Sequence, residues 1–219
     1  MSVIGRIMPI LVILYILPYI IQILNQVLEQ FRGVIVSDNF DDGTLNTDIW
    51  EIISDDPAGS TSEVDGVLRV TTSGGHHQGA VTKNSYDLTN TELTIKFVKN
   101  ENVRQTLQLG AEKRTDGAEP AECYYISHDR FDDVFEIRRK LYGEAGVQVA
   151  SKPLPSLPIT VKVRVEGNTI RFYLNDNLIH SEEWALSTKT CYIWLFVAGT
   201  TAEAYHGDSE YDDFILQRI

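Results

Sequence analysis

The sequence predicts an all-β protein, an antiparallel two-sheet sandwich, preceded by one N-terminal transmembrane-type α-helix. Two observations carry this prediction. A run without charged residues extends from Ile7 to Leu28, and from Gly33 onward apolar and polar residues alternate with a period of two. We therefore divide the chain into residues 1–33, a hydrophobic helix for membrane anchoring or assembly, and residues 34–219, a β-sandwich domain.

Composition favours a folded body and argues against some partners. Apolar residues make up 43% of the chain and charged residues 23%, which is ordinary for a globular protein. The formal net charge is −12 and no cluster of Lys and Arg occurs, so we expect no nucleic-acid partner. Cys123 and Cys191 form no metal-binding motif, and either one disulfide or two buried thiols would fit them.

The uncharged run is long enough to cross a membrane, because as a helix it would reach about 33 Å. Arg6 precedes the run, which slightly favours an inside N-terminus and places the body on the extracellular or virion-exterior face. The second half of the run carries a polar stripe made of Gln22, Asn25, Gln26 and Glu29. This stripe could face headgroup water, or it could hydrogen-bond between helices of neighbouring copies in a homo-oligomer.

Strand patterns fill the body. Leu93–Phe97 and Ile159–Glu166 alternate strictly, so one side of each belongs to the core. The turn sequences Gly167-Asn168 and Asn175-Asp176-Asn177 then predict a three-stranded meander. The stretch Cys191–Ala198 is apolar on both faces and should be an inner strand covered on both sides. About a dozen such strands suit two stacked sheets.

Four segments carry a resemblance to a known superfamily. They are Asp38–Trp50 (DNFDDGTLNTDIW), Ser62–Thr72 (SEVDGVLRVTT), Val165–Glu182 (VEGNTIRFYLNDNLIHSE) and Glu210–Leu216 (EYDDFIL). The chain from Ser37 to Gln217 thus resembles the concanavalin A-like lectin/glucanase superfamily, including laminin-G-like modules. The resemblance implies a jelly-roll sandwich. It leaves function open, because the superfamily includes glycan binders, glycoside hydrolases and structural modules.

A glucanase site is expected to be absent. Retaining glucanases of this superfamily carry E-x-D-x-x-E or E-x-D-x-E on one strand, where two carboxylates flank the scissile bond. The nearest stretch, Phe131–Glu136, has Phe131 in the place of the first Glu. Glu210 and Asp212 share one strand face, but they lie in the closing segment, where related sequences place no catalysis. The sequence therefore predicts that the protein is not an enzyme.

A structural Ca²⁺ site is the expected metal site. The resemblance implies that the first and last strands pair, which would bring Asp41 and Asp42 close to Asp212 and Asp213. Carboxylate oxygens are ligands that Ca²⁺ prefers, and some relatives hold calcium in this place. The alternative reading is that these aspartates cap turns and are solvated.

A glycan ligand would need exposed aromatic rings. Trp50 and Trp194 lie in strongly apolar stretches and are interpreted as packing residues, whereas Tyr142 and Tyr205 lie near loops and are the candidate ligand contacts.

Three functional hypotheses follow. The first is a non-enzymatic, membrane-anchored surface protein whose lectin-like sandwich binds glycan or another extracellular partner. The alternative is a structural subunit of a surface filament, sheath or virion. The third is a glycoside hydrolase of the same superfamily.

Overall fold

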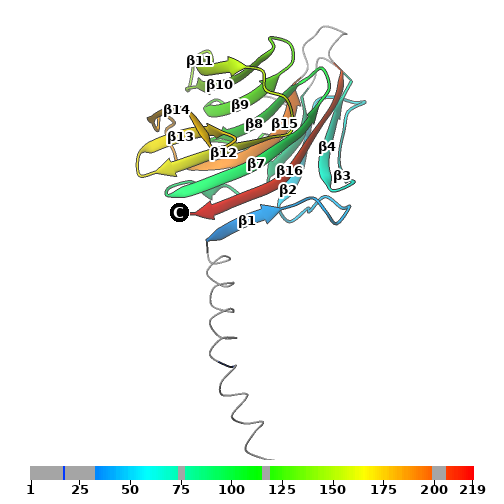
Figure 1. The fold of residues 1–219 in the computed structure, drawn as a ribbon, viewed down its shortest axis with the longest axis horizontal. Helices are drawn as coiled ribbons and strands as arrows, with labels where there is room; N and C mark the ends of the chain where they lie inside the picture. The colour runs from blue at the N-terminus through cyan, green and yellow to red at the C-terminus, as the bar shows by residue number, and fades with distance from the viewer. Residues whose placement is uncertain (1–16, 18–32, 74–76, 115–118, 199–205) are drawn as a thin grey trace, which may run out of the picture.

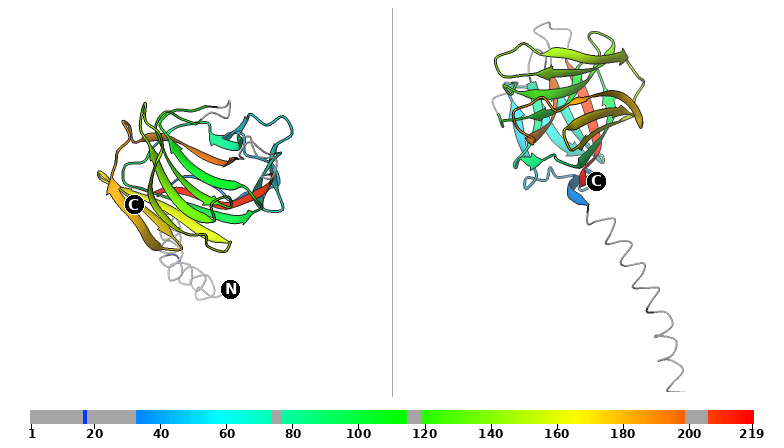
Figure 2. Two further views of the ribbon diagram at one scale, coloured as in Figure 1. Left: turned by 90° about the horizontal axis from the view of Figure 1, so that it is seen from above. Right: turned by 90° about the vertical axis from the view of Figure 1, so that its left-hand side faces the viewer.

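The structure is a computed structural model that describes residue 17 and residues 33–73, 77–114, 119–198 and 206–219. Strands β1 to β16 form two antiparallel sheets that lie face to face (Figures 1 and 2). The predicted all-β, two-sheet antiparallel sandwich is therefore confirmed.

Sheet A has the order β14-β13-β12-β7-β16-β4-β3, and β1 pairs with β16 beside this path. Its strands are Val34–Asp38 (β1), Ser60–Val64 (β3), Val67–Thr72 (β4), Thr91–Asn100 (β7), Ile159–Glu166 (β12), Thr169–Leu174 (β13), Asn177–Glu183 (β14) and Gly207–Arg218 (β16). The neighbours β12, β13 and β14 are the predicted meander.

Sheet B has the order β11-β10-β9-β8-β15-β5-β2, and β6 pairs with β15 beside this path. Its strands are Trp50–Ser54 (β2), His77–Thr82 (β5), Tyr86–Asp87 (β6), Arg104–Gly110 (β8), Cys123–Asp129 (β9), Val134–Lys140 (β10), Val147–Pro153 (β11) and Thr190–Ala198 (β15). Strand β15 lies between β8 and β5, so the doubly apolar segment is an inner strand as expected.

The main core lies between the sheets. In sheet A, Ile95 is paired with Val161 and Leu93 with Val163, and all four side chains are buried. Each buried aliphatic side chain of this kind contributes about 1.5–3 kcal/mol. The buried Tyr211 hydroxyl links the two layers, because it accepts the Thr106 N–H at 3.1 Å and donates to the carbonyl of Phe196.

The two cysteines are free and buried. Cys123 lies on β9 and Cys191 on β15, and β8 runs between these strands. Of the two alternatives, two buried thiols is the one found. Burial raises the pKa of each thiol to about 12, so both stay protonated at neutral pH.

The predicted hydrophobic helix falls on residues 1–16 and 18–32, outside the described residues, together with Gln22, Asn25, Gln26 and Glu29. In the part of the chain that the structure describes, no helix has the length and apolarity needed to cross a membrane. Membrane association and self-association therefore stay predictions.

Candidate functional site on the distal face of sheet B

Sheet B has one face that is turned away from the main core, and its side chains are unusually polar for buried residues. Leu107 and Leu109 of β8 point into the core. Thr106 and Gln108, which alternate with them along the strand, therefore lie on the opposite face. We call this side of the sheet the distal face. It carries Arg104, Thr106 and Gln108 from β8, Tyr125, Ser127 and Asp129 from β9, Glu136 and Arg138 from β10, and Trp194 and Phe196 from β15.

The register aligns these residues in two rows across the strands. One row runs Glu136, Ser127, Thr106, Phe196, and the next runs Arg138, Tyr125, Gln108, Trp194. A hydrogen bond of 3.0 Å joins the hydroxyls of Thr106 and Ser127 within the first row. Because side chains directly opposite on one face lie about 4.5–5.5 Å apart at Cβ, each row is continuous, polar at β8 and aromatic at β15.

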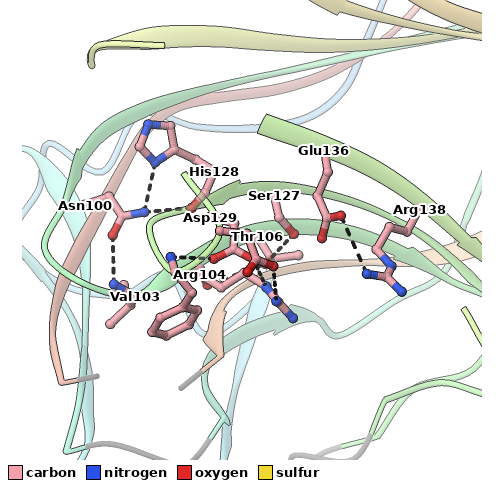
Figure 3. Close-up of polar contacts among 11 residues, drawn as sticks. Asn100, Val103, Arg104, Thr106, Ser127, His128, Asp129, Glu136 and Arg138 are labelled. Atoms are coloured by element: carbon pink, nitrogen blue, oxygen red, sulfur yellow. Dashed lines mark hydrogen bonds and ion pairs between the residues drawn. The ribbon is translucent and has the colours of Figure 1, made fainter. Parts of the chain in front are cut away.

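Glu136 is a buried carboxyl group, and one of its two oxygens lacks a hydrogen-bond partner among the described residues. Its exposed fraction is 2%, and no described residue hydrogen-bonds to its Oε1. Oε2 lies 3.6 Å from the Arg138 guanidinium (Figure 3). Burial raises the pKa of Glu136 above its ordinary value, while Arg138 and Arg104 act in the opposite direction. The group therefore keeps its proton to higher pH than an exposed glutamate.

Asp129 is a second buried carboxylate on the same face. Its Oδ2 accepts a hydrogen bond from Arg104 Nε at 2.6 Å, and its Oδ1 accepts the Phe131 N–H at 2.9 Å (Figure 3). Asp129 pairs with Val134, and Glu136 pairs with Ser127, so the two carboxylates stand diagonally across neighbouring strands. Diagonal positions are about 7–8 Å apart.

Asp129 and Glu136 flank the turn between β9 and β10. Arg130–Asp133 form this turn, and Asp133 has a left-handed φ of 50°. Two alternating strands around a short polar turn form a hairpin, and this hairpin puts the two acids on one face of the sheet, an arrangement that a one-strand carboxylate motif does not include.

Trp194 is a buried packing residue as expected, with 2% exposed. It belongs to a second apolar cluster with Ile53, Val81, Phe196 and Ala198. That cluster continues the distal face at β15, β5 and β2. Trp50, by contrast, lies in the main core as expected.

The structure brings together only part of the predicted calcium site. Asp42 and Asp213 line one pocket of about 420 Å³ with Asp38, whereas Asp212 lies 3.4 Å from Lys96 Nζ and Asp41 contacts Asn39. Among the described residues, no three His, Cys, Asp or Glu side chains are arranged to hold a metal ion. A centre made of all four aspartates is therefore not formed, and calcium binding itself stays a prediction.

The two candidate ligand tyrosines have different outcomes. Tyr142 is 78% exposed and lines a pocket of about 410 Å³ with Glu112, Glu122 and Ser187. Tyr205 lies outside the described residues. The pocket at Tyr142 stands at the loops between strands and not on the distal face.

Comparison with known proteins identifies the fold. No family model matches the chain, and no curated protein does. Among solved structures, one reported with endo-acting O-glycanases of human gut microbiota that initiate mucin breakdown has a TM-score of 0.68 at 12% identity and covers 85% of this chain and 100% of its own. An endo-β-1,3-glucanase from Pyrococcus furiosus has a TM-score of 0.63 at 13% identity, with 84% and 94% covered. A carbohydrate-binding module from Bacillus subtilis has 0.53 at 14%, with 80% and 97% covered.

These similarities show that the body of the chain shares its two-sheet β-sandwich fold with glucanases and a carbohydrate-binding module. They also correct the functional expectation, because neighbours of this fold include glucanases and an endo-β-galactosidase. The prediction of a non-enzymatic surface protein, drawn from the missing one-strand motif, is contradicted by these neighbours.

Proposed function

We propose that this chain is a glycoside hydrolase that binds its glycan across the distal face of sheet B and cleaves it with Glu136 and Asp129. One observation carries the proposal: a nine-tenths buried carboxyl with an unpartnered oxygen stands diagonally across from a second carboxylate on the same face. Glycosidases use two carboxyl groups, one as the acid and the other as the nucleophile or base.

The two environments suggest the two roles. Glu136, whose pKa burial raises, is the general acid that protonates the leaving oxygen. Asp129, held in an ion pair with Arg104, is the carboxylate that acts on the other side of the bond. Asp129 then acts on the anomeric carbon either directly as a nucleophile, with retention, or through a water molecule as a general base, with inversion.

A carbohydrate ligand is supported by the neighbours as well as by the face itself. A carbohydrate-binding module shares the fold, and the other neighbours named above act on glycans according to their descriptions. The distal face combines hydroxyl, carboxyl and guanidinium groups with the aromatic rings of Tyr125 and Trp194. Such a mixture is what a sugar needs, since it offers hydrogen bonds beside apolar ring faces.

The test is hydrolysis by the full chain of a β-1,3-glucan, a β-galactan and mucin O-glycans. Glu136→Gln keeps the shape of the side chain and removes the acid, so we expect a loss of about 100- to 10,000-fold in the rate. Asp129→Asn should cause a comparable loss. Asp132→Asn is the matched control, because Asp132 lies in the same hairpin with a 69% exposed side chain, and it should retain activity.

Thermal melting of each variant separates a catalytic loss from unfolding, which matters for Asp129 because of its ion pair. NMR of the first sugar product reports the anomeric outcome. The proposal is overturned if glycans bind without being cleaved, or if Glu136→Gln cleaves as fast as the unchanged protein.

A further inference from the structure

The three tryptophans of the chain differ in one respect. The indole N–H of Trp50 donates to Asp38 at 2.9 Å, and that of Trp184 donates to the carbonyl of Thr188 at 3.0 Å. The indole N–H of Trp194 has no hydrogen-bond partner among the described residues, although the side chain is 2% exposed. A buried donor without a partner costs about 1–3 kcal/mol, so this one calls for a ligand or a water molecule.

A second unpartnered donor stands directly beside it. Gln108 on β8 is the cross-strand partner of Trp194 and is 1% exposed, and its Nε2 has no nitrogen or oxygen acceptor among the described residues. The thiol of Cys123 next to Gln108 is only a weak acceptor. Since opposed residues lie about 4.5–5.5 Å apart, the two N–H donors can converge on one oxygen.

The groups around the two N–H donors indicate which kind of ligand oxygen fits between them. A Cβ added to Gly110 would meet Trp194 Nε1 at 3.1 Å and Pro120 Cγ at 2.7 Å, so the indole N–H lies over a bare backbone. The other neighbours are the apolar side chains Ile53, Val81 and Phe196. A sugar hydroxyl would bring its own proton into surroundings where these side chains offer no acceptor. A carbonyl oxygen brings none and can accept from both donors.

We propose that Gln108 and Trp194 form an acetamido-binding subsite, so that the glycan is one that carries N-acetylhexosamine residues. The acetamido carbonyl accepts the two N–H groups, and its methyl group packs against the apolar cluster. An anionic group is disfavoured, because both donors are neutral and the chain has a net charge of −12. The inference rests on the proposed function, since it names the substrate of the same face.

The experiment compares two oligosaccharide series with the same β-1,4 backbone, chito-oligosaccharides and cello-oligosaccharides, which differ in the acetamido group at C2. Binding to the full-length Glu136→Gln protein is measured by calorimetry, and the indole N–H resonance of Trp194 is followed by NMR. We expect the acetylated series to bind about tenfold or more tightly than the other, with a shift of the Trp194 N–H signal.

The variants remove one donor each. Trp194→Phe keeps an aromatic ring without the N–H, and Gln108→Leu keeps the approximate volume without the amide, so each should reduce the preference for the acetylated series several-fold. Trp184→Phe is the control, because the Trp184 N–H is already used, and it should keep the preference. The subsite is overturned if both series bind equally, if neither binds, or if both variants retain the full preference.

These outcomes are separate from those of the hydrolase test. Cleavage of the glycans without an acetyl preference removes the subsite alone. A clear acetyl preference with no cleavage of any substrate removes the hydrolase and leaves the subsite standing.

Discussion

Glu136 owes its raised pKa to burial, and Arg138 is the cation that limits the rise. Arg138 lies 3.6 Å from the carboxyl group, stacks over the Tyr125 ring at 5.8 Å and donates to the Gly146 carbonyl at 3.1 Å. These contacts fix the guanidinium beside the proposed acid. Its charge favours the deprotonated form of Glu136 and therefore sets the pH at which the acid is lost.

We predict that Arg138→Met moves the alkaline limb of the pH–rate profile to higher pH. A general acid works while protonated, and removal of the cation raises the pKa of Glu136 further, so activity should fall only at higher pH. Arg138→Lys, which keeps the charge, should move the limb less. The measurement is kcat/KM against pH on the best substrate. A limb that moves to lower pH, or that is identical in all three proteins, contradicts the assignment of the acid.

The contacts of single side chains are harder to predict from the sequence than the strands are. The sequence pointed to Tyr142 because it adjoins a loop, and it is indeed exposed, but nothing local marks Gln108 or Trp194 as unpartnered. Whether a buried N–H finds an acceptor depends on the neighbouring strands, here β8 beside β15. Asp129 and Glu136 were within reach of prediction, because a hairpin relates them through a turn of four residues.

At the scale of elements, the pairing of β1 with β16 forms the acidic pocket that Asp38, Asp42 and Asp213 line. Asp38 is opposite Phe214, which brings the opening segment against the closing strand as the resemblance implied. Period-two alternation could predict the strands themselves and the inner position of β15. It could not predict the irregular register of β16 between Asp212 and Ile215. Beside this irregularity Lys96 Nζ lies 3.4 Å from Asp212 and 3.7 Å from Asp213, so the lysine pairs with both aspartates of β16, and Asp213 also lines the pocket.

We predict that Ca²⁺ binds in the pocket that Asp42 and Asp213 line, where the side-chain oxygens of Asn39 and Asn46 are further hard oxygen donors. EDTA should then lower the melting temperature and added Ca²⁺ restore it. Binding to the folded state alone adds about 2.7 kcal/mol at a hundredfold excess over Kd, or several degrees for a domain of this size.

Substitutions at the pocket test this placement. Asp42→Asn and Asp213→Asn should blunt the calcium response, and asparagine suits the left-handed φ of 51° at Asp213. Asp41→Asn is the control, because Asp41 is not among the pocket residues. Equal melting curves with EDTA and with Ca²⁺ would show that these aspartates serve only as turn caps.

At the scale of the whole molecule, the sandwich is complete within residues 33–219. Every described strand pairs with another described strand, and the main core draws on residues from Phe40 to Leu216. The Gly33 carbonyl accepts the Arg218 N–H at 2.6 Å, which fastens the start of β1 to the end of β16.

We predict that deletion of residues 1–32 yields a soluble sandwich with one cooperative thermal transition, because the core and all strand pairs begin at or after Gly33. The fragment keeps Gly33 so that the bond to Arg218 remains. If the upstream segment serves anchoring or self-association, the full chain should form larger particles in mild detergent than the fragment does in buffer. The comparison uses size-exclusion chromatography with light scattering and melting curves of both proteins. A fragment that aggregates or melts without cooperativity would mean that the sandwich needs the preceding segment for its own folding, and the division at Gly33 would be wrong.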